Sequence, residues 1–150
     1  AAKTCGVRSF YVVTPLADQK ALIDKIVSHW VKGIGAKYNP KRKEALDLIC
    51  VKNSLDEVTD HIYKNGGEYP KTVVTSAGQG NRNISFSKFR EMTNDDNLYL
   101  LIFGTGWGLS EEFITKADYV LDPIIGNTGY NHLSVRSATA IILDRLFGKN

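Results

Sequence analysis

The sequence predicts an α/β domain in which helices cover both faces of a parallel β-sheet. Five short apolar runs, each about the length of a strand, alternate with segments of helical pattern. Strands that alternate with helices form parallel sheets, because each helix returns the chain to the edge where the next strand begins. The chain has 150 residues, of which 43% are apolar and 23% are charged, as is ordinary for one globular domain.

The first half of the chain contains two of these strands and two helices. Residues 8–14 are a near-continuous apolar run that ends before a proline, as in a strand buried on both faces. Apolar residues then recur at steps of three and four up to about Gly33, which predicts an amphipathic helix. Residues 48–51 predict the second strand. Ser54 and Glu57 form a capping box, which predicts a helix that ends at a Gly-Gly pair.

The second half of the chain repeats the order of strand and helix three times. The predicted strands are residues 71–77, 98–103 and 119–121. The predicted helices that follow them are residues 85–92, 111–115 and 133–147. No internal repeat, low-complexity tract or linker interrupts this order, so we expect one compact domain over residues 1–150.

Composition excludes several classes of protein. No apolar run approaches the roughly 20 residues of a membrane span, so we expect a soluble protein without a membrane partner. The net charge of +3 permits an anionic partner but is far from that of a histone-like binder. Cys5 and Cys50 lack a Cys-x-x-Cys spacing and no signal peptide is recognisable, which predicts reduced thiols and a cytoplasmic protein. No two histidines have metal-site spacing, so we expect no metal site.

The densest functional signal is a glycine-rich segment directly after the predicted strand at residues 98–103. Residues 102–110, IFGTGWGLS, place three glycines at alternate positions. Glycine lets a backbone approach a ligand closely. The dinucleotide fingerprint requires a different spacing after the first strand and an acidic residue about 20 positions later, and this segment fails both conditions. Taken alone, these glycines are compatible either with a ligand loop or with a tight turn.

Two further loops follow predicted strands or open the last helix. DPIIG at residues 122–126 follows the last strand, and NHLSVRSA at residues 131–138 opens the last helix. Ligands of parallel sheets bind at the carboxyl ends of the strands. Ile124 and Ile125 can wall a flat ring there while free backbone groups read its edge, as in many small-molecule sites.

These segments resemble motifs of a known family. IFGTGWGLS and residues 121–146, LDPIIGNTGYNHLSVRSATAIILDRL, resemble the second and third motifs of the SPOUT, or α/β-knot, RNA methyltransferases. The matching branch, which methylates ribose 2′-hydroxyls, has a pattern of roughly FGxExxGLS followed by IPMxGxxxSLNVSxAAAILL. The opening AAKTCGV resembles the end of the first motif of that branch. Residues 16–97 support the resemblance only through their order of strands and helices.

The resemblance implies a C-terminal deep trefoil knot, S-adenosylmethionine bound in a bent form within it, and a homodimer with the active site at the subunit interface. Carried over by position, the cofactor-binding residues are Phe103, Gly104 and Gly106 from the second motif, and Ile124, Ile125, Gly126, His132 and Leu133 from the third. The end of the third predicted strand adds Thr75, Ser76 and Ala77 by topology.

The chain departs from the family pattern at several positions. Trp107 stands where the family usually has acidic or small polar residues. Ser134 takes the position of the family's Asn, Arg136 takes that of its Ser, and Asn131 offers an amide three residues earlier. The family's catalytic Arg would fall immediately before Ala1, so we expect the sequence to start within a longer chain. The catalytic candidates inside the sequence are therefore Asn131, Ser134 and Arg136.

The expected function is S-adenosylmethionine-dependent methylation of RNA, in the first place of a ribose 2′-hydroxyl of tRNA. One alternative is a base-nitrogen methyltransferase of the guanine-N1 type. Another is an inactive module that only binds RNA or cofactor, because the family's Arg is absent from the sequence. Residues 130–138, YNHLSVRSA, most resemble small bacterial SPOUT domains that occur beside, or fused to, a tRNA guanine-N1 methyltransferase. This resemblance predicts such an association.

Other residues have a functional and a structural interpretation that the sequence leaves open. The basic residues Lys37, Lys41, Arg42 and Lys43, and also Arg82, Lys88 and Arg90, are compatible with RNA contact or with a solvated surface. His29 is expected to be a packed or surface residue, and Tyr130 is expected to pack in the core, with stacking on an RNA base as the alternative. An apolar stripe on the last helix predicts a homodimer interface, with packing inside one chain as the alternative. The stripe contains Val135, Ala138, Ile142 and Leu146, with Ile141 beside it.

Overall fold

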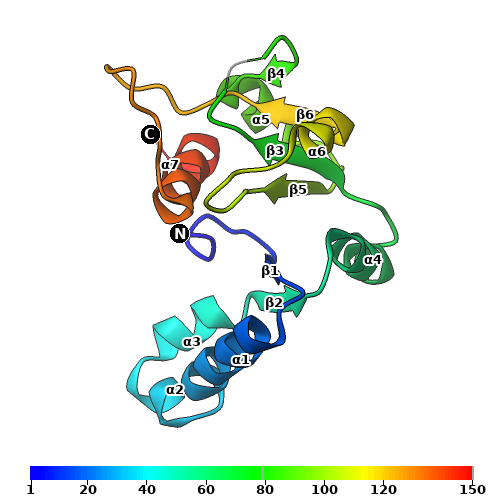
Figure 1. Cartoon of the computed structure of the whole chain (residues 1–150). Helices are drawn as coiled ribbons and strands as arrows, with labels where there is room; N and C mark the ends of the chain where they lie inside the picture. The colour runs from blue at the N-terminus through cyan, green and yellow to red at the C-terminus, as the bar shows by residue number, and fades with distance from the viewer. Residues whose placement is uncertain (79, 150) are drawn as a thin grey trace. The chain divides into compact units, whose positions relative to one another are not determined.

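The structure is a computed structural model that describes residues 1–78 and 80–149. Its contacts divide the chain into two compact units, which we call the N-terminal unit, Ala2–Glu68, and the C-terminal unit, Tyr69–Asn150 together with Ala1. Figure 1 shows the elements of each unit in chain order. The expectation of a single domain over residues 1–150 stays a prediction.

The N-terminal unit contains a two-stranded parallel sheet. Strand β1, Phe10–Val13, pairs with β2, Ile49–Lys52, in a register that places Tyr11 beside Cys50. Helix α1, Ala17–Val31, contacts β2, and helix α4, Leu55–Gly66, contacts both strands. Both strands and both helices predicted for this half of the chain are present, with boundaries within a few residues of those expected.

Two short helices that the apolar pattern did not predict lie between α1 and β2. They are α2, Ile34–Tyr38, and α3, Pro40–Leu46. A Cβ at Gly33 would lie 2.7 Å from the carbonyl oxygen of His29, so glycine is needed for the tight turn that ends α1. The side chain of Asn39 accepts a hydrogen bond from the backbone of Arg42, and Pro40 follows it at the first helical position, which together start α3.

The C-terminal unit contains a four-stranded, entirely parallel sheet in the order β4-β6-β3-β5 (Figure 1). The strands are β3, Lys71–Thr75, β4, Asn83–Ile84, β5, Tyr99–Ile102, and β6, Tyr119–Leu121. The helices are α5, Phe86–Met92, α6, Glu111–Lys116, and α7, Val135–Phe147. Among the elements formed by residues 69–78 and 80–149, the two-residue strand β4 alone was not predicted.

The core of the C-terminal unit lies on both faces of this sheet, because successive strand residues point to opposite sides. On one face, Val73 and Leu121 pack with side chains of α5 and α7, namely Phe89, Ile142 and Leu146. On the other face, Val74 and Val120 pack with Ala117 and with side chains of α6. This confirms an α/β fold with a parallel sheet and helices on both of its faces, whereas the trefoil knot stays a prediction.

Serine side chains start four of the helices. Ser54, Ser85, Ser110 and Ser134 each accept a hydrogen bond from the backbone N–H three residues later. At the predicted capping box, the Glu57 carboxylate reaches back to the backbone and side chain of Asn53. These hydrogen bonds hold the pKa of Glu57 below its ordinary value.

Two findings bear on the classes of protein considered above. Both cysteines, Cys5 and Cys50, are free thiols. Across residues 1–78 and 80–149, no helix combines the length and the apolar character required to cross a membrane.

The tyrosine at the start of β5 gives a pH-dependent prediction. Tyr99 donates a hydrogen bond of 2.8 Å to Asp95, and burial together with this carboxylate raises the pKa of Tyr99 to about 12. A tyrosine in the unfolded chain titrates near about 10. The protonated phenol of Tyr99 therefore makes its full contribution to the free energy of unfolding below pH about 10. This contribution is lost as the pH rises toward about 12.

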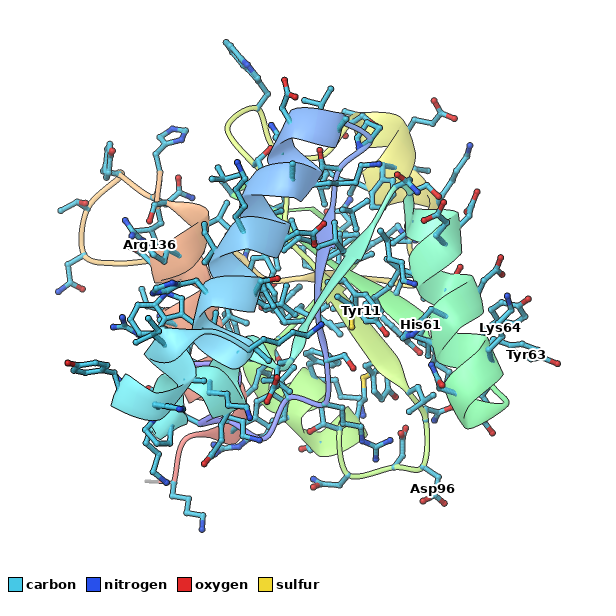
Figure 2. The ribbon with its side chains drawn as sticks, turned by 90° about the horizontal axis from the view of Figure 1, so that it is seen from below. Tyr11, His61, Tyr63, Lys64, Asp96 and Arg136 are labelled. Carbon is cyan, nitrogen blue, oxygen red and sulfur yellow. The ribbon has the colours of Figure 1, made fainter. Side chains whose placement is uncertain are left out.

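We predict that Asp95→Asn lowers the pKa of Tyr99 toward that of an unfolded tyrosine, because it removes the negative charge beside the phenol. Ultraviolet titration of the tyrosinates, compared with the parent chain, measures the change. Asp96→Asn is the matched control, because it removes the same charge one residue away (Figure 2). Identical titration curves for Asp95→Asn and Asp96→Asn would contradict the prediction.

Candidate cofactor site

The candidate site is built on the carboxyl ends of three neighbouring strands. Strand β3 pairs in parallel with β5 on one side and with β6 on the other, so the loops after all three begin at the same edge of the sheet. The Thr75 hydroxyl donates a hydrogen bond of 3.1 Å to the carbonyl oxygen of Ile102, and Thr75 lies beside Leu121 in the register. The end of β3 therefore lies directly beside the start of the glycine-rich loop.

A side-chain hydrogen bond joins the loop after β6 to the end of β3. The Asn131 amide donates to the carbonyl oxygen of Ala77 at 2.8 Å, across 54 positions of sequence. The Ser76 hydroxyl accepts a hydrogen bond of 3.1 Å from the backbone of Gly78, which shapes the turn after β3. The structure thus brings together Asn131 and the segment Thr75–Ala77, two groups of residues that the sequence assigned to one site.

The three glycines after β5 differ in what the fold requires of them. A Cβ at Gly104 would lie 2.5 Å from the backbone of Gly108, and Gly108 itself has a φ of 76°. Both are therefore needed by the turn, which the Gly108 N–H closes by donating to Thr105 at 2.6 Å. Gly106 has an ordinary φ and no atom within 4 Å of the position of a Cβ, so its backbone faces open space. The turn interpretation holds for Gly104 and Gly108, and the ligand interpretation remains for Gly106.

The loop between β6 and α7 presents most of its predicted cofactor residues to solvent. Ile124 is partly buried against the core, but Ile125 is 57% exposed and Leu133 is 41% exposed. Gly126 resembles Gly106 in having nothing within 4 Å of the position of a Cβ. His132 is exposed and makes an edge-to-face contact with Tyr130, with ring centroids 5.7 Å apart. Phe103, at the opening of the glycine-rich loop, also packs partly against the core.

The three catalytic candidates have different surroundings. Asn131 is engaged with Ala77, and the Ser134 side chain caps α7 by accepting from the backbone of Ser137 at 3.2 Å. Arg136 is exposed in the first turn of α7 (Figure 2), and among the described residues its guanidinium has no hydrogen bond or ion pair. A cation is unfavourable at a helix N-terminus by about 0.3–1 kcal/mol. Arg136 therefore does not stabilise its own helix, and its guanidinium is available to an anionic group.

The basic residues beyond β3 have partners within the protein. Arg82 donates to the carbonyl oxygens of Thr115 and Ala117, at the end of α6, at 3.0 and 3.1 Å. Arg90 donates to the carbonyl oxygen of Gly148, and Lys88 forms an ion pair of 3.7 Å with Glu91. Contacts within the protein therefore account for Arg82, Lys88 and Arg90 without RNA contact. His29 likewise packs edge-to-face against Trp30, at 5.0 Å between ring centroids.

A polar cluster in the N-terminal unit was not identified from the sequence. Tyr11 and Nδ1 of His61 (Figure 2) share a hydrogen bond of 2.9 Å. The Asn65 amide donates to Nε2 of the same ring at 3.2 Å. Because an amide nitrogen only donates, Nε2 accepts and Nδ1 carries the proton. Burial raises the pKa of Tyr11, although a hydrogen bond with Ser9 opposes this. The sequence did not reveal the cluster because Tyr11 and His61 are 50 positions apart and meet through the packing of α4 on β1.

An open groove of about 660 Å³ lies elsewhere in the C-terminal unit. It is lined by residues of α5 and of the end of α7, among them Arg90 and Lys149. None of the predicted cofactor or catalytic residues lines it. The groove therefore gives no support to the predicted site.

The different roles of the glycines give a stability prediction. Gly104→Ala forces a methyl group against the backbone of Gly108 and should lower the free energy of unfolding by about 1–3 kcal/mol. Gly106→Ala places the same group in open space and should change it by less than about 0.5 kcal/mol. Urea unfolding of both variants measures the difference. Equal losses for the two substitutions would contradict this account of the loop.

Comparison with solved structures agrees with the fold. The structure of a probable methylase family protein from Haemophilus influenzae matches with a TM-score of 0.64, over 96% of this chain and 55% of that chain. The two sequences are 21% identical. The similarity therefore shows a shared fold.

Comparison with known sequences identifies relatives. A protein of Aquifex aeolicus, described only as uncharacterized, is 38% identical over 150 residues, which are 99% of this chain and 73% of that protein. Two tRNA (guanine-N(1)-)-methyltransferases, from Nitratidesulfovibrio vulgaris and Oleidesulfovibrio alaskensis, are 43% and 39% identical over 145 residues. These cover 97% of this chain but only 34% of each methyltransferase, so the chain spans about a third of their length.

The family assignment covers nearly the whole sequence. The sequence profile of a family described as SAM-dependent RNA methyltransferase matches residues 1–148. The match includes both units of the structure and all three loops at the carboxyl edge of the sheet. This chain belongs to that family of S-adenosylmethionine-dependent RNA methyltransferases.

Proposed function

We propose that this chain methylates a base nitrogen of tRNA, of the guanine-N1 class, with S-adenosylmethionine as the methyl donor. The observation that carries the proposal is the family match over residues 1–148. The choice of acceptor rests on the two relatives named tRNA (guanine-N(1)-)-methyltransferase. Those relatives extend well beyond the matched region, so the test must use this chain by itself.

A ribose 2′-hydroxyl of tRNA is the second candidate acceptor. It rests on the resemblance of IFGTGWGLS and of residues 121–146 to the motifs of the SPOUT branch that methylates ribose. We also propose the SPOUT fold with its knot. The sheet order supports this, because β6, the last strand of the chain, lies between β4 and β3 rather than at an edge.

The residues at the carboxyl edge of the sheet fit the cofactor. Gly106 and Gly126 leave space where a side chain would stand, which allows a ligand to approach the backbone. Ile125 and Leu133 offer exposed apolar surface for the flat adenine ring. Arg136 offers a cation for the carboxylate of the cofactor or for a phosphate of the RNA. The proposed cofactor residues are those predicted from the sequence, with Gly104 acting through the turn.

The proposed chemistry requires a proton acceptor. When bound, S-adenosylmethionine supplies a methyl group on a positively charged sulfur. Guanine N1 carries a proton at neutral pH, which must leave as the new N–C bond forms. The amide of Asn131 and the guanidinium of Arg136 do not accept protons in proteins. Two groups in segments 76–82, 103–110 and 122–134 can accept the proton, the imidazole of His132, which is placed among the cofactor residues, and the carboxylate of Asp122, which follows β6. We assign Asp122 as the proton acceptor.

We predict that this chain transfers a labelled methyl group from S-adenosylmethionine to tRNA and that digestion of the product yields 1-methylguanosine. A 2′-O-methylated nucleoside would support the second candidate. Binding of cofactor without any transfer would identify an inactive binding module, and calorimetry without heat for either S-adenosylmethionine or S-adenosylhomocysteine would contradict the cofactor assignment.

Two variants separate binding from catalysis within this experiment. Asp122→Asn should slow methyl transfer about a hundredfold or more while cofactor binding persists. Gly106→Val should abolish cofactor binding without unfolding the chain, because a branched side chain then occupies the open space beside the loop.

We also propose that the chain forms a homodimer and acts beside, or fused to, a tRNA guanine-N1 methyltransferase. The last helix has less apolar surface available for a dimer than expected, because Ile142 and Leu146 are buried in the core of the C-terminal unit. Apolar surface remains before and at the start of α7, where Tyr130, Leu133 and Val135 are 70%, 41% and 39% exposed, and at its end, where Phe147 is 39% exposed. The association with a second methyltransferase rests on the relatives that contain this region.

The dimer proposal predicts about twice the 16.6 kDa monomer mass in light scattering at micromolar concentration. Leu133→Lys together with Val135→Lys should reduce the mass to that of the monomer, because buried charges without partners disfavour an interface. A parent chain with the monomer mass would contradict the dimer.

A further inference from the structure

We propose that the segment from Lys32 to Lys43, which contains α2 and the first four residues of α3, docks an unpaired stretch of the RNA substrate. We call this segment the basic hairpin. The proposal rests on the proposed function for the identity of the partner as RNA. It adds an RNA-binding surface on the N-terminal unit to the proposed site of methyl transfer at the carboxyl edge of the sheet in the C-terminal unit.

The distribution of charge is the first argument. The N-terminal unit has 11 Lys and Arg against 8 Asp and Glu, whereas residues 69–150 have 8 of each. The whole excess of +3 therefore belongs to the N-terminal unit. The basic hairpin alone has five basic residues in twelve and no acidic residue, and Glu44 follows it directly within α3. A run of cations without interspersed carboxylates attracts a polyanion.

The structure holds the basic hairpin in a fixed conformation through Trp30. A Cβ at Gly35 would lie 2.7 Å from the Trp30 ring, so α2 packs directly on this ring through a buried glycine. The Arg42 guanidinium lies 4.3 Å from the centroid of the same ring, in a cation–π contact that joins α3 to α1. Because one aromatic ring holds both short helices, the exposed side chains are presented at fixed positions and lose less entropy on binding.

The side chains that the basic hairpin exposes suit an unpaired nucleic acid strand. Lys37, Lys41 and Lys43 are exposed, and none of them pairs with a carboxylate among the described residues. Tyr38 lies between them in sequence and is 86% exposed. Lysines bind phosphates without regard to sequence, and an exposed aromatic ring stacks on a base that is not already stacked in a duplex. The basic hairpin therefore offers both cations and an exposed aromatic ring.

Binding of fluorescent single-stranded RNA and of unfractionated tRNA to the full chain, followed by anisotropy over a range of salt concentrations, tests the proposal. The triple variant Lys37→Gln, Lys41→Gln, Lys43→Gln should bind at least tenfold more weakly. The slope of log affinity against log salt should become shallower by about 2, because each phosphate contact on a single strand contributes about 0.7. The matched control Lys64→Gln, Lys88→Gln, Lys116→Gln removes the same charge from exposed positions elsewhere.

Tyr38 separates base stacking from a general attraction between charges. Tyr38→Ala should weaken binding about tenfold without changing the salt slope, and Tyr38→Phe should bind like the parent chain, since stacking needs the ring and not the hydroxyl. Vesicles rich in phosphatidylserine serve as a competing polyanion. Binding of vesicles but not RNA through the same lysines would overturn the proposal, and so would equal affinities and slopes for the two triple variants.

Failure of the proposed function has a different signature. If the parent chain transfers no methyl group but binds RNA through the three lysines, the docking surface stands and the methyltransferase proposal fails. If the triple variant methylates tRNA with an unchanged KM, the docking surface fails and the methyltransferase proposal stands.

Discussion

The parallel pairing of β3 with two neighbours is the constraint on which the rest of the C-terminal unit depends. Its middle residues, Val73 and Val74, have no exposed surface, and they point into opposite cores. A shift of one residue in the register would exchange the two cores and expose apolar groups on both faces. Burial of these two valines therefore fixes which residues of β5 and β6 lie beside the end of β3, and so which loops share one edge.

The glycine-rich loop shows how structural and functional demands divide within one motif. Gly104 is required because the backbone of Gly108 lies too close for any side chain, and Gly108 is required because its φ of 76° is in the left-handed region. Gly106 lies between them under no such demand. A rigid turn on either side of an open backbone position is a means of presenting that position to a ligand without the entropy loss of ordering a flexible loop. The turn and the ligand interpretations of this motif are therefore complementary.

Much of the fold was predictable from the sequence. Every strand other than β4 coincides with an apolar run of the sequence, and Ser54 with Glu57 marks the start of a helix. The strand β4 was not predictable, since two residues have no periodicity and β4 forms only by pairing with β6. The same holds within the site. The resemblance to the methyltransferase family placed Asn131 and Ala77 in one site, and the structure joins them by a hydrogen bond. The different requirements at Gly104 and Gly106 appear only when the distances between backbone segments are known.

Electrostatics give a reason for two separate binding surfaces in a protein of this kind. The cofactor carries a positive sulfonium and RNA is a polyanion, so a strongly basic surface that favours the RNA disfavours the reactive group of the cofactor. Equal numbers of acidic and basic residues in the unit that contains the cofactor loops avoid that conflict. The whole net positive charge belongs to the unit that contains the basic hairpin, where the Trp30 ring contacts both Gly35 and the Arg42 guanidinium. A basic N-terminal unit can therefore attract the RNA, while a C-terminal unit without net charge does not repel the positive sulfonium of the cofactor.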